Sequence, residues 1–418
     1  MIQSTRQTQP QNHRMSTALM DCLQATKPVL AVLALLCAGM ARASLPYPMF
    51  SWDTVPVCLH FGSATRMTDE QIQLAARMSN LICLEKAHGT QTDREHPERV
   101  VGEDARRIKQ ANPRAQVLMY WNTLIAWPFT SYNRSLAATH PRDWILRDVK
   151  TGEPLLKAER GDFQVFQYNL LNPAVRKWWA ETIGGAVREF GFDGFFMDAV
   201  SQSKRPIWLQ RGWGPDKAAE LDAAAIDMMQ RARAIIGPNR LLIYNGFRAK
   251  AAAVDGQAAA GTEFLPYADG AMIEHFDGLS STAKEDMLLY WQMAAEAAQA
   301  GKTVIYKCWP DHDINWLNRA FMARSAAEKE AVARRRITYP LACFLIGARE
   351  NSFFCYGWGY NIADGQLIEY PEYGRRLGPP KEEAVRQPGT WVFRREFEHA
   401  KVTVDLERRE GTIQWLGD

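Results

Sequence analysis

Two carboxylates in the sequence follow short apolar runs, an unusual position for a charged group. Asp198 ends the run 194–198 (GFFMD), and Glu274 lies near the end of the run 271–275 (AMIEH). Hydrolysis of a glycosidic bond needs two carboxyl groups facing each other across that bond, one of them protonated at neutral pH. We therefore interpret Asp198 and Glu274 as a candidate catalytic pair. The structural alternatives are a loop-ordering role for Asp198 and an ion pair between Glu274 and a basic neighbour.

A second aspartate, Asp193, is the third residue of the stretch GFDGFFMDAV, which begins at Gly191. Successive side chains of a strand point to opposite faces, so Phe196 and Asp198 share one face while Asp193 lies on the other. Asp193 also stands at the amino end of the run. We predict that it caps backbone N–H groups or pairs with a basic residue, and that only Asp198 is exposed where chemistry occurs.

Eight short apolar runs alternate with helix-length segments from Val57 onward. Near-continuous apolar strands separated by helices predict a parallel sheet covered by helices, and eight such strands predict a (β/α)8 TIM barrel. An open doubly wound sheet is the alternative, but no GxGxxG motif follows the first run. The expected strands are 57–61, 81–85, 117–121, 194–198, 241–245, 271–275, 304–308 and 352–356.

Cap signals mark two of the expected helices. Thr68 precedes an acidic first turn, and Asn172 precedes Pro173, which suits a first helical position. The longest insertion, about 123–170, separates the third strand from its helix. Further helices are expected near 98–111, 215–236, 281–300 and 321–346.

Polar and aromatic residues gather at the carboxyl ends of the expected strands, where barrels of this kind carry their chemistry. Flat aromatic rings stack on sugar faces, and polar groups bind sugar hydroxyls. Glu85 with Lys86 also fits a simple ion pair, Asn245 a loop-stabilising amide, and Asp311 a helix cap. The predicted substrate-binding residues are Glu85, Lys86, Tyr120, Trp121, Asn122, Asn245, His275, Lys307, Trp309, Asp311 and Trp358.

The first 43 residues have the order of a secretory signal peptide. Lys27 and Pro28 precede the apolar run VLAVLALLCAG, and ARA precedes Ser44. The run is shorter than the roughly 18 apolar residues of a membrane span. We predict cleavage after Ala43, a secreted or periplasmic protein with no membrane anchor after cleavage, a catalytic barrel over 44–378 and a C-terminal antiparallel β appendage over 379–418.

Charge and motifs exclude several classes of function. Without the leader, the chain holds 46 basic and 46 acidic residues and no basic stripe, which argues against a nucleic-acid partner or an electrostatic membrane partner. No GxSxG, HExxH or P-loop motif occurs. The triplet DHD at 311–313 has no spaced partner motif, so we predict neither a metal nor a cofactor. Five scattered cysteines remain after the leader, which indicates buried thiols.

Several segments, in order, resemble TIM-barrel proteins classed as hypothetical glycoside hydrolases: FSWDTVPVCLHFG, LICLEK, NPRAQVLMYWN, NLLNPAVRKWW, GFDGFFMDAV and GTWVFRREFEHAKVTV. The resemblance covers most of the mature chain. More distantly, an aspartate ending strand four and an acid ending strand six are similar to the α-galactosidase clan and to α-galactosaminidase-like barrels. That resemblance implies Asp198 as nucleophile and Glu274 as acid/base, with retention and an α-linked carbohydrate substrate. The final segment has Asp405 where an asparagine is more usual.

Two other classes of function remain compatible with the sequence. A non-catalytic carbohydrate-binding barrel would keep the aromatic residues but would need no carboxyl pair. A lyase or epimerase acting on uronic sugars would place Tyr, His or Lys at its centre, and His275, Lys86 and Lys307 are compatible with that chemistry.

Overall fold

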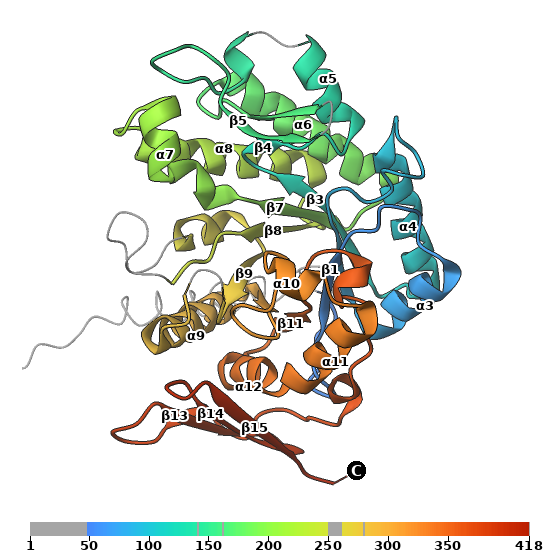
Figure 1. Ribbon diagram of the computed structural model, residues 1–418, viewed down its shortest axis with the longest axis vertical. Coiled ribbons are helices and arrows are strands. Elements are labelled where there is room, and N and C mark those ends of the chain that lie inside the picture. Colours follow the sequence, from blue (N-terminus) through green and yellow to red (C-terminus); the bar gives the residue numbers. More distant parts are fainter. Residues whose placement is uncertain (1–47, 140–141, 161–162, 250–260, 279–280, 418) are drawn as a thin grey trace, which may run out of the picture. The chain divides into compact units, whose positions relative to one another are not determined.

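Eight parallel strands form a nearly closed barrel in the computed structural model, which describes residues 48–139, 142–160, 163–249, 261–278 and 281–417 (Figure 1). The predicted leader lies outside the described residues. An isolated parallel bridge between Val57 and Phe354 links the first strand to the last. In order around the barrel, the strands are β1 (Cys58–Phe61), β2 (Leu81–Leu84), β3 (Gln116–Asn122), β7 (Gly194–Asp198), β8 (Leu241–Asn245), β9 (Gly270–Phe276), β10 (Thr303–Cys308) and β11 (Ser352–Tyr356).

All eight predicted strands are confirmed, each within one residue of its expected bounds. Side chains such as Leu118, Phe196 and Met272 fill the barrel interior. Their neighbours along each strand, such as Met119 and Phe195, pack outward against the helices. Both faces of the sheet are therefore buried, which explains why the strands are continuously apolar in sequence.

Helices cover the outside of the barrel, and the predicted caps are present. Thr68 forms a capping box with Gln71, and the Asn172 side chain accepts a hydrogen bond from the Ala174 N–H. The covering helices are α3 (Asp69–Met78), α4 (Pro97–Ala111), α6 (Pro173–Phe190), α8 (Ala218–Ile236), α9 (Lys284–Gln299), α11 (Ala326–Arg336) and α12 (Thr338–Gly347).

The single helix predicted over 321–346 is wrong, because the structure divides this segment. Ser325 caps α11 through a capping box with Glu328, so the helix begins at Ala326. Pro340 has no N–H to donate to the carbonyl of Arg336, and the chain breaks into α11 and α12 near that point. The short α10 (Arg319–Met322) precedes them.

The insertion after β3 folds into a small sheet of its own with strand order β4-β6-β5. Its elements are β4 (Ile125–Ala126), α5 (Ser131–Thr139), β5 (Leu156–Arg160) and β6 (Phe163–Gln167). Short helical segments occur at Arg142–Trp144, Val200–Lys204, α7 (Pro206–Trp208), Leu209–Trp213, Thr262–Tyr267, Ile362–Asp364 and Pro371–Gly374.

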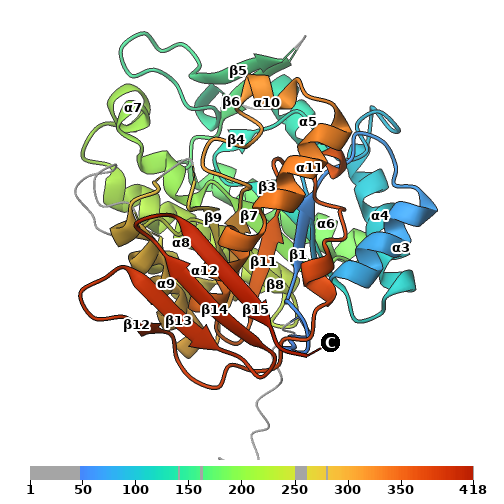
Figure 2. The ribbon, with the colours of Figure 1, turned by 60° about the horizontal axis from the view of Figure 1, so that its bottom comes forward.

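The predicted C-terminal β segment is a separate four-stranded antiparallel sheet (Figure 2). The Phe393 ring packs against Trp291 of α9 with centroids 5.0 Å apart, and the buried Arg395 guanidinium donates to the carbonyls of Leu345 and Ala348 at the end of α12. The sheet therefore rests on two barrel helices. Its strands are β12 (Val385–Arg386), β13 (Val392–Glu396), β14 (Ala400–Asp405) and β15 (Glu410–Trp415).

The structure also supports two predictions about individual residues. Asp193 accepts hydrogen bonds from the Lys109 ammonium at 2.7 Å and from the Val117 N–H at 2.9 Å, so it braces the entry of β7 as expected. The five cysteines among the described residues are all buried and free. Within the described part of the chain, no helix is long and apolar enough to cross a membrane.

Gly194 allows β7 to approach β8, and its replacement tests the barrel packing. Its φ is +151°, and an added Cβ would lie 1.9 Å from the Leu241 carbonyl oxygen. We expect Gly194→Ala to lower the free energy of unfolding by more than about 3 kcal/mol, measured by urea denaturation. Gly185→Ala in α6 meets no atom within 4 Å and should raise stability by about 0.5–1 kcal/mol. Equal denaturation midpoints for the two variants would contradict this account.

Candidate active site

Asp198 ends β7, and Glu274 lies two residues before the end of β9, both on the inner side of the barrel. Phe196 and Met272, two residues before them, belong to the interior cluster. Alternation therefore directs both carboxylates into the opening at the carboxyl ends of the strands. Both are partly exposed, and the side chain of Glu274 retains 16% of its accessible surface.

Asn245 joins the two carboxylates. It ends β8, the strand between β7 and β9. Its Nδ2 donates one hydrogen bond of 2.8 Å to Asp198 Oδ1 and another of 2.8 Å to Glu274 Oε2. Two such bonds from one planar NH2 group place the accepting oxygens about 5 Å apart.

Four donors hold the Asp198 carboxylate in one orientation. Oδ2 accepts from the Tyr120 hydroxyl and from Asn122 Nδ2 at 2.8 Å. Oδ1 accepts from Asn245 and from the Ala199 N–H at 2.8 Å. The indole N–H of Trp179 in turn donates to the Asn122 carbonyl at 2.8 Å, so α6 supports the end of β3.

Glu274 receives donors on both oxygens. Oε1 accepts from the Tyr360 hydroxyl at 2.6 Å. Oε2 accepts from Asn245 and lies 3.4 Å from Arg248 Nη2 and 3.3 Å from His275 Nε2. The alternative role predicted for Glu274 was an ion pair with a basic residue. The structure places Arg248 beside Glu274 and also joins Glu274 to Asp198 through Asn245.

The surroundings shift the two pKa values in opposite directions. Burial raises the pKa of Asp198, and the charge of Glu274 raises it further. Burial also favours protonated Glu274, but His275, Arg248, Tyr360 and Asn245 together hold its pKa below the usual range. Burial lowers the pKa of His275 to about 4, so its imidazole is neutral at neutral pH.

Backbone strain occurs within three residues after the ends of β2, β7 and β9, at the rim of the barrel that the carboxyl ends of the strands form. Ala87, Ala199 and Asp277 have positive φ angles of 66°, 64° and 51°. Non-glycine residues rarely adopt this conformation, and such strain is typical of functional sites. At Ala199 the turn aims the backbone N–H at Asp198.

Glu85 and Lys86 form a second charged pair beside the first. Lys86 Nζ donates to both oxygens of Glu85 at 2.9 Å. The same ammonium lies 4.8 Å from the Tyr120 ring centroid and 5.4 Å from that of Tyr360. Burial tends to lower the pKa of Lys86, but Glu85 and Asp198 raise it overall, so the ammonium stays charged near the nucleophile candidate.

Aromatic rings line the side of the site next to Glu274. The His275 ring stacks on Trp309 at 5.8 Å and on Trp316 at 6.0 Å, and Trp316 meets Tyr360 edge-on at 4.9 Å. Trp316 is partly exposed, whereas Trp309 is buried. Lys307 Nζ lies 4.4 Å from the Trp309 ring centroid. These rings provide a surface on which a sugar ring can stack.

The structure brings most of the sequence-predicted site residues into one connected set of contacts. That set comprises Asp198, Glu274, Glu85, Lys86, Tyr120, Asn122, Asn245, His275, Lys307 and Trp309.

Trp121 and Trp358 face the helical layer instead. Both are buried in the outer core, where Trp121 meets Tyr132 and Trp358 meets Phe321, each at 6.2 Å. Alternation explains Trp121, because Tyr120 and Asn122 on either side of it point inward. The structure therefore does not bring these two tryptophans to the carboxylate pair.

Asp311 belongs to a clamp between the C-terminal sheet and the rim. Arg409, in the turn between β14 and β15, donates to Asp277 Oδ1 at 3.0 Å and to Asp311 Oδ1 at 2.8 Å. Arg336 donates to Asp311 Oδ2 at 3.0 Å. Asp277 directly follows β9, which carries Glu274, so the clamp connects the C-terminal sheet to the end of the strand that carries this candidate residue.

The triplet Asp311–His312–Asp313 brings three ligand atoms within 4.8 Å of one another. Two arginines and His312 already engage both oxygens of Asp311. Positive guanidinium groups oppose the binding of a cation at the same oxygens, so the donor set does not fit a metal.

Four residues of the site were not predicted from the sequence: Arg205, Arg248, Trp316 and Tyr360. Each lies several residues beyond a strand end, in a loop whose path only the folded chain defines. The stretch GWGYNIADG, which contains Tyr360, fails the spacing of a nucleotide-binding fingerprint, so no motif marks this tyrosine. A tyrosine or arginine within four residues of a strand end is the signal that could have identified Tyr360 and Arg248.

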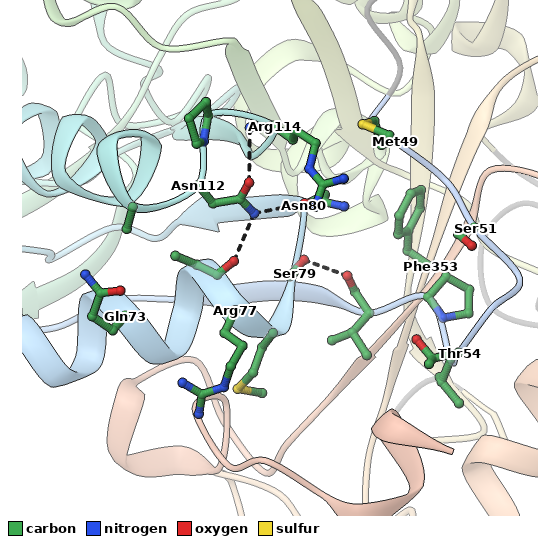
Figure 3. A pocket seen from close by; sticks show the side chains of 17 residues that line it. Met49, Ser51, Thr54, Gln73, Arg77, Ser79, Asn80, Asn112, Arg114 and Phe353 are labelled. Atoms are coloured by element: carbon green, nitrogen blue, oxygen red, sulfur yellow. Dashed lines mark hydrogen bonds between the residues drawn. The ribbon is translucent and has the colours of Figure 1, made fainter. Parts of the chain in front are cut away.

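A cavity of about 630 Å³ opens at the other end of the barrel (Figure 3). Its lining includes Ser79, Asn80, Asn112 and Phe353, at the amino ends of strands. Asn112 Nδ2 donates to Asn80 Oδ1 and to the Ala76 carbonyl, and Ser79 Oγ donates to the Val57 carbonyl. These amide and hydroxyl groups are paired, and this end of a barrel serves stability.

Residues 109–401 match the sequence model of a family described as "Hypothetical glycosyl hydrolase family 15". The matched segment contains Asp198, Asn245 and Glu274. No curated protein matches the sequence.

Solved structures with a similar fold include glycoside hydrolases of several kinds. An α-galactosidase from Thermus thermophilus has a TM-score of 0.43 and 15% identity, covering 87% of this chain and 68% of that one. A maltogenic α-amylase from Thermotoga neapolitana has a TM-score of 0.48 and 13% identity, covering 86% and 87%. The glycoside hydrolase domain of PelA from Pseudomonas aeruginosa has a TM-score of 0.43 and 11% identity, covering 73% and 95%.

Asp277 should make stability depend on pH. Burial raises its pKa to about 7, against about 3.9 in an unfolded chain. Between these values the folded state binds more protons, so stability falls as pH rises from about 4 to 7. Asp277→Asn should reduce the difference between urea denaturation midpoints at pH 5 and pH 8, whereas the exposed Asp313→Asn should not. Equal pH differences in wild type and Asp277→Asn would contradict this expectation.

Proposed function

Because the chain belongs to the family described as hypothetical glycosyl hydrolase family 15, we propose that Asp198 and Glu274 are the carboxyl groups with which this glycoside hydrolase cleaves its substrate. The proposed substrate is an α-linked oligo- or polysaccharide. The proposed mechanism retains the anomeric configuration.

The bridge through Asn245 is the observation that carries the proposal. It places one oxygen of each carboxyl group about 5 Å apart, beside the opening of the barrel. Retaining glycosidases have carboxyl groups about 5–5.5 Å apart, whereas inverting enzymes leave about 6.5–9.5 Å for a water molecule. The short separation supports retention.

In the proposed reaction, Asp198 attacks the anomeric carbon while Glu274 protonates the leaving oxygen. Glu274 then takes a proton from water, and that water hydrolyses the glycosyl ester on Asp198. Tyr120, Asn122 and Asn245 hold the attacking carboxylate. The buried Asn245 Oδ1 has no hydrogen-bond partner among the described residues, so a sugar hydroxyl can donate to it.

The assignment of roles within the pair has arguments on both sides. The pKa directions favour a proton on Asp198 and a charge on Glu274, the reverse of the proposed order. However, His275 is neutral above about pH 4, so the largest of the charges that lower the pKa of Glu274 is absent at neutral pH. Amide N–H groups only donate, and three of them stabilise the charged form of Asp198. We therefore keep Asp198 as nucleophile.

Two further parts of the proposal rest on the sequence. The α-linkage follows from the resemblance of Asp198 and Glu274, on the fourth and sixth barrel strands, to the α-galactosidase clan. The signal-like leader supports a secreted or periplasmic location, where the substrate is a polysaccharide outside the cell.

Substitution of the carboxyl pair tests the proposed activity. A glycan library is screened with the mature chain and the products are read by mass spectrometry. On any substrate found, Asp198→Asn and Glu274→Gln should each lower kcat about a thousandfold or more. Asp193→Asn, at the other end of the same strand, should lower stability but leave kcat of the folded protein within about twofold. Unchanged turnover in the first two variants would overturn the assignment, and glycan binding without turnover in wild type would favour a binding barrel.

Stereochemistry and covalent labelling test the mechanism separately. Proton NMR of the first-formed product should show the anomeric configuration of the substrate. A fluorinated glycosyl inhibitor of the matching sugar should label the peptide that contains Asp198. A label on Glu274 would reverse the roles, and an inverted product would exclude a retaining mechanism.

A further inference from the structure

Donor groups of the protein already bind all three carboxylates of the site. Each oxygen of Asp198, Glu274 and Glu85 accepts at least one hydrogen bond from a described residue. No oxygen of these acids therefore lacks a partner, although an oxygen with one donor can still accept a second hydrogen bond. The polar groups of the site that have no partner among the described residues are of other kinds.

The unsatisfied groups of the site are mainly donors, and two of them are cationic. Arg248 Nη1 and Lys307 Nζ are buried and have no hydrogen-bond partner among the described residues. The same holds for Trp309 Nε1, a donor, and for His275 Nδ1. A buried donor without an acceptor costs about 1–3 kcal/mol, and more if it is charged. A ligand that brings acceptors with negative charge would remove this cost.

The two unsatisfied cations flank Glu274. Arg248 lies 3.4 Å from Glu274 through Nη2, which leaves Nη1 open. Lys307 Nζ lies over Trp309 at 4.4 Å and Tyr360 at 5.6 Å, and Tyr360 bonds the other oxygen of Glu274. A further guanidinium, that of the more exposed Arg205, interacts electrostatically with Arg248 and with both carboxylates of the pair.

Charge supports the same conclusion. Desolvation and the like charge of Arg248 lower the pKa of Arg205, the direction expected for two neighbouring guanidinium groups. Burial also lowers the pKa of Lys307. An anion bound between these groups would offset the repulsion and raise the pKa of Lys307 again.

We propose that the site recognises an acidic sugar, with Arg248 and Lys307 binding its anionic group beside Glu274. The proposal rests on the proposed glycoside hydrolase function and names its substrate class. Guanidinium and ammonium groups bind carboxylates through charge-assisted hydrogen bonds, and we commit to a uronic acid as the acidic sugar. A neutral sugar would satisfy the indole and imidazole groups but would bring no negative charge to Lys307 Nζ or to the open Nη1 of Arg248.

Binding measurements on the Asp198→Asn chain test the proposal without consuming the ligand. The probes for isothermal titration are α-linked uronic-acid oligosaccharides, the same oligosaccharides after carboxyl reduction, and sulfated oligosaccharides of equal length. Each acidic probe that fits should bind about tenfold or more tightly than its reduced counterpart. Tighter binding of the sulfated set would identify sulfate as the anionic group.

Variants of the two cations locate the preference. Arg248→Gln and Lys307→Met should each lower the affinity for the acidic probe about tenfold more than they lower the affinity for the reduced probe. Arg188→Gln, an exposed arginine on α6, removes the same charge far from the site and should leave both affinities unchanged. Equal binding of acidic and reduced probes, or an equal effect of Arg188→Gln, would overturn the proposal.

Turnover by the wild-type chain separates this proposal from the proposed function. Hydrolysis of reduced probes as fast as acidic ones would overturn the acidic-sugar proposal and leave the hydrolase function intact. Preferential binding of acidic probes without any hydrolysis would overturn the function while retaining the recognition. An unsaturated product would also overturn the hydrolase function while retaining the recognition of an acidic sugar, and it would indicate a uronic-sugar lyase.

Discussion

The two hydrogen bonds from Asn245 are the interaction on which the site depends. At about 5 Å and an effective dielectric constant near 20, two carboxylates repel each other by on the order of 3 kcal/mol. The shared amide, the Arg248 guanidinium and the Lys86 ammonium offset that repulsion. The bridge requires β8 to lie between β7 and β9 in parallel register, and Gly194 allows β7 to approach β8. Barrel closure and the proposed chemistry therefore depend on the same strand packing.

The rim that surrounds this bridge is held under strain and supported from outside. Left-handed backbone at Ala87, Ala199 and Asp277 costs on the order of 1–3 kcal/mol at each residue. Arg409 of the C-terminal sheet binds the loops after β9 and β10, and Trp179 of α6 binds the end of β3. The C-terminal sheet thus packs against the barrel helices α9 and α12, and through Arg409 it also binds the loops after β9 and β10 beside the candidate active site.

Much of the fold and part of the site follow from local patterns in the chain. Continuous apolar runs predict all eight barrel strands, and the period of two along a strand separates Asp193 from Asp198. The cap residues Thr68 and Asn172 mark two helix starts. Pro340 lies inside an otherwise helical pattern, and the one helix predicted there is two in the structure. The same period of two, applied to Trp121, turns its ring away from the barrel interior.

The sequence by itself determined the eight strands, their order, the face on which Asp198 lies and the place of Asn245 and Glu274 near strand ends, because these depend on spacing between residues that are close in the chain. Only the tertiary structure decided which groups surround them. Arg248, Trp316 and Tyr360 come from loops, and Arg409 reaches the rim from the last hairpin. Their contacts join residues far apart in the chain, and no local pattern records such distances. The charges that favour an acidic ligand therefore come together only when the barrel gathers these loops at one rim.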